Sequence, residues 1–189
     1  MGSRERILAG IKSTKSNVDV SLQYTVSGIV YGNRKAQFED VLTSIGGRIM
    51  EARSSDVIKE YVSSQIEAGK KVIDVTVQTE FNCSANELYL VDTAVVNGSV
   101  AVAENGAIWI SEKQMGYRLL PFSCKELVII IHEQDIINNM QEAYDLIDIA
   151  SEGYGVFISG PSKTADIEQS LVIGAHGPIE LLVIIKKYH

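Results

Sequence analysis

Two glycine-rich segments near the end of the chain carry the side chains best suited to bind or transform a ligand. They are Gly160-Pro161-Ser162-Lys163-Thr164 and Gly174-Ala175-His176-Gly177-Pro178. Lys163 supplies a positive charge, and Ser162 and Thr164 supply hydroxyl groups, so the first segment could hold a phosphate or a carboxylate. The alternative is an ordinary capped loop whose lysine faces solvent.

The first segment is expected to lead into a short helix. Asp166 and Gln169 have the D-x-x-Q spacing of a capping box. Backbone N–H groups at the amino end of a helix attract anions, so this helix would strengthen anion binding. Lys163-Thr164 resembles the end of a phosphate-binding P-loop, but the upstream G-x-x-x-x-G spacing is missing, which excludes a Walker motif.

His176 lies between small residues that leave its ring room to reach a ligand. Imidazole changes charge near neutral pH, which suits proton transfer. The alternative is a structural histidine bonded to a loop carbonyl. His132 and His189 do not fall at metal-ligand spacing with it, Cys83 and Cys124 form no cluster, and no G-x-G-x-x-G motif is present. The sequence therefore indicates no metal site and no redox cofactor.

Glu104, in Ala103-Glu104-Asn105-Gly106, is the third candidate. Asn-Gly between two short strands is typical of a hairpin turn, which is the structural interpretation. The chemical interpretation is nucleophilic catalysis. The segment resembles the S-E-N-G segment of class I CoA transferases, in which the glutamate attacks an acyl thioester.

The elements that must position these residues alternate between strands and helices. Amphipathic stripes predict helices around Phe38–Ile45, Ile58–Ile66 and Met140–Ile147, and the last of these is expected to continue to near Gly153. Apolar runs predict strands over residues 48–52, 72–77, 127–131, 156–159 and 181–185, with further short strands between 88 and 111. Runs that are apolar on both faces are typical of a parallel sheet covered by helices. We therefore expect an α/β three-layer sandwich with a largely parallel central sheet.

The amino-terminal region has a different pattern. A short helix capped by Ser3 precedes Val18–Val26, where apolar and polar residues alternate strictly and predict a half-buried strand. Ser27-Gly28 could turn the chain into a second strand at Ile29–Tyr31. This pair is either a β-hairpin arm that packs against a partner subunit, as in a homo-oligomer, or an edge strand. The expected domains are residues 1–35, the helix and the arm, and residues 36–189, a single α/β domain.

Composition narrows the class of protein further. The 189 residues are 46% hydrophobic and carry a net charge of −7, which argues against a broad nucleic-acid footprint. No apolar run approaches the roughly 18 residues of a membrane span, and the charged segment Met1–Arg6 does not resemble a signal peptide. Two widely spaced cysteines suit a reducing compartment. We expect a cytoplasmic protein that binds neither nucleic acid nor membrane.

The run from Ser159 to Pro178 closely resembles the signature of the LUD domain, the family of lactate-utilization protein C. Its core is the long S-G-P-S-K-T-A-D-I-E-Q match that begins at Ser159. The Glu104 segment is similar to the A-E-T-G segment of LUD domains, and Gly46-Gly47-Arg48 and Arg118-Leu119-Leu120 extend the match. The residues that match the family pattern are Glu104, Gly160, Ser162, Lys163, Thr164, Asp166, Glu168, His176 and Gly177.

The resemblance implies a NagB/RpiA/CoA transferase-like fold and a role in oxidising L-lactate to pyruvate beside iron–sulfur or cysteine-rich partner proteins. The chain would then be an accessory non-redox subunit, with a small anionic ligand between the Glu104 turn and the two glycine-rich loops. Two alternatives stay open. One is a stand-alone enzyme, acyl- or sugar-phosphate-directed, that uses Glu104 or His176, and the other is a ligand-sensing module without catalysis.

Overall fold

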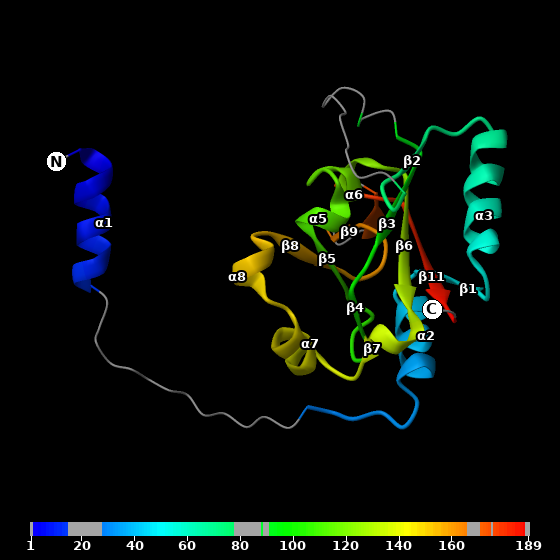
Figure 1. The fold of residues 1–189 in the computed structure, drawn as a ribbon, viewed down its shortest axis with the longest axis horizontal. Coiled ribbons are helices and arrows are strands. Elements are labelled where there is room, and N and C mark those ends of the chain that lie inside the picture. The colour runs from blue at the N-terminus through cyan, green and yellow to red at the C-terminus, as the bar shows by residue number, and fades with distance from the viewer. Residues whose placement is uncertain are drawn as a thin grey trace.

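The computed structural model describes residues 2–14, 28–77, 88, 91–165, 171–174 and 176–187. Its central sheet has five parallel strands in the order β1-β11-β6-β3-β2 (Figure 1). The strands are β1 (Arg48–Ala52), β2 (Val72–Asp74), β3 (Thr93–Asn97), β6 (Glu126–His132) and β11 (Glu180–Lys186). The continuous apolar run of β6 is buried because strands pair with it on both sides and other elements cover both faces. The predicted α/β class and parallel sheet are confirmed.

A second, four-stranded sheet lies against one face of the first, in the order β7-β4-β5-β8. Its strands are β4 (Val100–Val102), β5 (Ile108–Ser111), β7 (Ile136–Ile137) and β8 (Gly155–Ile158). The main core fills the space between the sheets, where Ile129 and Val183 of the central sheet belong to the same buried cluster as Ile108 and Ile110. Side chains in strands alternate between faces, so the neighbouring residues of β6 and β11 point the other way.

Helices cover the outer faces of both sheets (Figure 1). Ile58 of α3 (Ser55–Glu67) packs with Val128 and Ile184 of the central sheet. Ala143 of α7 (Met140–Leu146) packs with Val102 and Trp109 of the second sheet. The remaining helices are α1 (Ser3–Thr14), α2 (Arg34–Ser44), α5 (Glu112–Met115), α6 (Leu120–Ser123), α8 (Ile149–Glu152) and the 3-10 turn η1 (Glu133–Asp135).

Three local predictions need correction. Ile29–Tyr31 is not a strand, because side-chain amides satisfy its backbone: Tyr31 N donates to Asn138 Oδ1 at 2.9 Å, and Asn139 Nδ2 donates to Ile29 O at 3.0 Å. Strand β2 ends at Asp74, whose carboxylate accepts from the backbone and hydroxyl of Thr76 in an Asx turn. The helix expected from Met140 to Gly153 is two helices, α7 and α8, separated at Ile147.

The arm strand predicted over Val18–Val26 lies outside the described residues, so the hairpin arm and the division at residue 35 stay predictions. Within the ranges that the structure describes, no helix is both long enough and apolar enough to cross a bilayer.

Candidate functional site

The two glycine-rich segments line one cavity of about 510 Å³, which we call the Lys163 cavity. Gly160, Ser162 and Lys163 come from the first segment, and His176 and Gly177 come from the second. Each segment follows a strand that ends at this side of the molecule, β8 for the first and β10 (Leu171–Ile173) for the second. The structure therefore places these five predicted site residues around one cavity.

Backbone contacts fix the two segments relative to each other. Ser162 N donates to Pro178 O at 2.9 Å, and Gly174 N donates to Ser162 O at 3.0 Å. A Cβ atom at Gly177 would lie 3.1 Å from Ser162 Cβ, so the loops touch where Gly177 has no side chain. Lys163 and His176 thus line the cavity from two segments that are hydrogen-bonded to each other.

Lys163 also has a structural partner. Its Nζ donates to the carbonyl of Ile45, the residue that caps the carboxyl end of α2. A cation suits this position, because the carboxyl end of a helix carries partial negative charge. An ammonium group has three donors. No second protein partner is found for Lys163 among the described residues, so the remaining donors can serve a ligand.

The helix expected to follow the first segment falls on residues outside those that the structure describes. Residues Lys163–Ala165 form strand β9, which pairs antiparallel with β10. Thr164 is therefore a strand residue, and Asp166, Glu168 and Gln169 lie in the segment 166–170, outside the described residues. At Lys163–Ala165 an anion would meet side chains and backbone amides, because a strand has no helix dipole to offer.

Glu104 lies beside the Lys163 cavity without lining it. The turn between β4 and β5 is the predicted hairpin, and Glu104 Oε2 accepts from the backbone N of Met140, the first residue of α7, at 3.0 Å. The next residue joins the turn to the cavity wall, since Ser159 Oγ donates to Asn105 O at 2.7 Å. A carboxylate that caps a helix amino end has a structural role, and a nucleophilic role for Glu104 stays a prediction.

A second cavity of about 470 Å³, which we call the Leu119 cavity, adjoins the first. The two share Phe122, His176 and Gly177 as lining residues. Its other walls are mainly apolar and come from Leu88, Val91, Leu119, Cys124 and Ile179. The sequence did not reveal this cavity, because scattered apolar residues on several elements have the same pattern whether they line a cavity or fill a core.

Cys124 in the Leu119 cavity is expected to be chemically inert. Burial raises the pKa of its thiol to about 12, so the reactive thiolate is scarce at neutral pH. Alkylation of Cys124 by iodoacetamide, followed by peptide mass spectrometry, should be on the order of a thousandfold slower in the native chain than in denaturant. Equal rates in the two states would show that the cavity leaves the thiol open.

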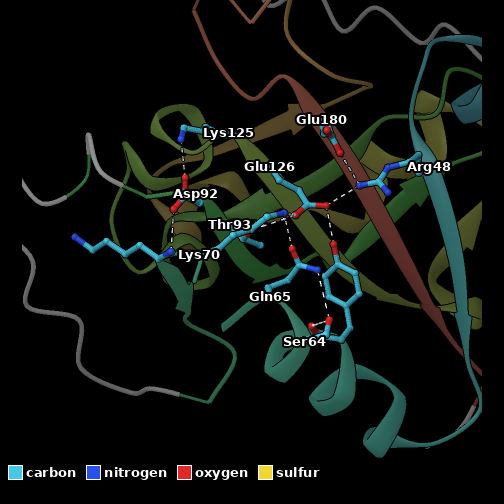
Figure 2. A network of polar contacts seen from close by, with 11 residues as sticks. Arg48, Ser64, Gln65, Lys70, Asp92, Thr93, Lys125, Glu126 and Glu180 are labelled. Atoms are coloured by element: carbon cyan, nitrogen blue, oxygen red, sulfur yellow. Dashed lines mark hydrogen bonds and ion pairs between the residues drawn. The ribbon is translucent and has the colours of Figure 1, made fainter. Parts of the chain in front are cut away.

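A buried network joins the amino ends of the central strands (Figure 2). Glu126, only 5% exposed, accepts from Arg48 Nη2 at 2.6 Å, Tyr61 Oη at 2.6 Å and Thr93 Oγ1 at 3.0 Å. Burial, and then the bond to Glu126, raise the pKa of Tyr61. Open parallel sheets bind ligands at the opposite, carboxyl edge. We therefore interpret this Glu126 network as structural. Sequence reasoning missed it, because its members lie far apart along the chain.

A third cavity, of about 420 Å³, lies at the carboxyl edge of the central sheet under α3. Asp74, Asn97 and Lys186 reach it from three strands, and Ser55 and Lys59 reach it from α3. None of the predicted site residues lines this cavity. It carries charges of both signs, so its electrostatics select no one class of ligand.

The fold and the Lys163 cavity together define an α/β protein in which two glycine-rich segments line one cavity. The chain belongs to the LUD domain family, whose model matches residues 76–185, more than half of the chain. Both glycine-rich segments and the Glu104 turn lie inside the matched range. Membership of the wider NagB/RpiA/CoA transferase-like superfamily stays a prediction.

Curated relatives carry the name lactate utilization protein C. The protein from Bacillus pumilus (strain SAFR-032) is 33% identical over 98 residues, which cover 49% of this chain and 41% of that protein. The protein from Geobacillus kaustophilus (strain HTA426) is 28% identical over 100 residues, covering 50% and 42%. The matches thus span less than half the length of these relatives.

A solved structure resembles the fold. It is the crystal structure of a DUF162 family protein from Deinococcus radiodurans, with a TM-score of 0.62 and 18% sequence identity. The likeness covers 84% of this chain and 99% of that chain, and at this identity it bears on the fold alone.

Proposed function

We propose that this chain is an accessory, non-redox subunit of an L-lactate utilization system and that it binds a small anionic ligand in the Lys163 cavity. The observation that carries the proposal is the meeting of Lys163, Ser162 and His176 at one cavity from two segments bonded together. The names of the relatives favour the lactate-related role.

The binding mode follows from the chemistry of the lining. The Lys163 ammonium and the Ser162 hydroxyl donate to a carboxylate, which prefers charge-assisted bonds. The His176 ring lies on the other loop and can exchange a proton with a hydroxyl or keto group. Gly160, at φ 77°, lets the first segment pack closely on Ile45, because a Cβ atom there would lie 3.2 Å from Ile45 O.

Partner proteins would carry the electrons. Oxidation of L-lactate to pyruvate removes two electrons and two protons, so an electron acceptor must take part. Two cysteines in this sequence are too few for the four-cysteine ligation of an iron–sulfur cluster. We therefore assign the redox step to iron–sulfur partners, and copurification of the chain with such proteins would support the subunit role.

Lys163→Met tests the anion site. We expect isothermal titration with L-lactate and pyruvate to give a dissociation constant roughly 10- to 100-fold weaker in the variant, the loss of one charge-assisted hydrogen bond. Methionine keeps the length of the side chain but removes the charge. Lys113→Ala, which removes an exposed lysine that lines none of the three cavities, is the matched control and should bind as the parent does. Equal affinity of parent and Lys163→Met would overturn the proposed site.

The second candidate is a stand-alone enzyme in which Glu104 or His176 acts on an acyl or sugar-phosphate substrate. The hydrogen bond between Ser159 and the Glu104 turn favours it, since it brings that turn next to the cavity. Turnover by the isolated chain that is lost in Glu104→Gln would support this candidate. Tight binding with neither turnover nor partners would instead indicate a ligand-sensing module.

A further inference from the structure

The Lys163 cavity and the Leu119 cavity together have more room than a three-carbon acid needs. Their volumes are about 510 and 470 Å³, and Phe122, His176 and Gly177 line both. Pockets of about 300–1,000 Å³ hold drug-sized ligands. A molecule the size of lactate at Lys163 would leave the Leu119 cavity unfilled.

The two cavities differ in chemistry. Among the described residues that line the first cavity, Lys163 is the only lysine, arginine or acidic side chain. In the part of the second lining that the structure describes, the only such residue is Lys125, and its charge is matched by Asp92, whose Oδ1 lies 2.7 Å from Lys125 Nζ. The second lining also contains partly exposed apolar residues: Leu119 and Ile179 are each 52% exposed, and Phe122 is 37% exposed.

Exposed apolar walls beside a cationic cavity favour a ligand that has an anionic head group and an apolar chain. Covering apolar surface is favourable roughly in proportion to the area removed from water. A chain that leaves the head group at Lys163 and passes Phe122 would cover Leu119 and Ile179, both of which line the second cavity.

We propose that the site takes an amphipathic anion, whose carboxylate binds at Lys163 and whose aliphatic chain lies in the Leu119 cavity. This inference rests on the proposed anion site and adds the class of ligand. No covalent step is involved.

The test is a series of straight-chain carboxylates from propionate to octanoate, titrated by calorimetry below their micellar concentrations. Each methylene that enters the Leu119 cavity should tighten binding roughly two- to fourfold, until the chain fills the cavity. Trp109 gives a second readout, because it is the only tryptophan and its ring centroid lies 4.9 Å from that of Phe157, a lining residue of the Lys163 cavity.

Two variants test the binding of the aliphatic chain and of the carboxylate separately. Leu119→Asp places a charge in the apolar cavity and should abolish the gain with chain length. The fold should tolerate it, because the Leu119 side chain is 52% exposed and a charge there can stay hydrated. Ile149→Asp, at another half-exposed helix start, is the matched control and should keep the full series. Lys163→Met should weaken every member of the series.

The outcomes distinguish this inference from the anion site on which it rests. If affinity depends on Lys163 but is flat from propionate to octanoate, the aliphatic chain has no site and this inference fails, while the proposed anion site stands. If affinity rises with chain length equally in the parent and in Lys163→Met, the head group has no site and both fail. A rising series that Leu119→Asp leaves intact places the chain elsewhere and also overturns the inference.

Discussion

Glu126→Ala is expected to lower the free energy of unfolding by about 2–5 kcal/mol, because it leaves buried donors without their acceptor. Thr93 is fully buried, and its hydroxyl donates to Glu126 Oε2 (Figure 2). The Tyr61 hydroxyl donates to Glu126 Oε1. Water cannot readily replace a carboxylate that is only 5% exposed. The half-exposed Arg48 can rehydrate, so the loss comes chiefly from Thr93 and Tyr61.

Urea denaturation would measure the Glu126 effect, with an unchanged m value as evidence that the unfolded state is the same. Glu180→Ala is the matched control, since Glu180 contacts the same guanidinium at 2.8 Å but is 58% exposed. An exposed pair of this kind contributes about 0–1 kcal/mol. Glu126→Gln, which keeps one acceptor oxygen, should fall between the two. A loss in Glu126→Ala no larger than in Glu180→Ala would contradict a structural role for the network.

Gly155→Ala is expected to destabilise the chain by about 1–3 kcal/mol, because the new methyl group has no space. An ideal Cβ atom at Gly155 would lie 2.2 Å from Trp109 Cζ2 on the neighbouring strand β5. The indole cannot easily move: it is 5% exposed, its Nε1 donates to Glu152 Oε2 at 2.7 Å, and its ring packs on Phe157. Judged from the sequence alone, Gly→Ala in a strand would be expected to stabilise by restricting the unfolded chain.

The sign of the Gly155 effect can be measured by urea denaturation followed by circular dichroism. Gly32→Ala is the control, since no atom lies within 4 Å of its ideal Cβ, and its stability should be equal or higher. Trp109→Phe removes part of the obstructing ring, so Gly155→Ala should cost less in that background than in the parent. A Gly155→Ala chain as stable as the parent would mean that Trp109 can leave its position.

Short-range patterns in the sequence were sufficient to predict most of the fold. The apolar run of Leu127–Ile131 predicted a buried parallel strand, and the stripe from Phe38 to Ile45 predicted α2, which ends at Ser44. Both depend on spacing within one element, which sets the face that can be buried. The grouping of Lys163 with His176 came from two neighbouring segments and a long family match, and the structure places both residues at one cavity.

Tertiary structure alone decided the contacts between distant elements. Arg48, Thr93 and Glu126 begin three strands far apart in the sequence, and they meet because parallel strands joined by crossovers bring their amino ends to one edge of the sheet. Pairing with β10 makes Lys163–Ala165 a strand, which the sequence patterns did not predict. The side chains of Asn138 and Asn139 form the hydrogen bonds to the backbone of Ile29 and Tyr31 that a neighbouring strand would otherwise form.

The same division between sequence patterns and tertiary contacts applies to the candidate site. Residue types along the chain identified a cation, a hydroxyl and an imidazole, because these groups have the same chemistry in any fold. The apolar cavity beside them, the bond from Lys163 to the end of α2 and the Glu104 carboxylate at the start of α7 depend on packing between separate elements. No local pattern encodes such packing, because it is set by how the two sheets and their helices fill one core.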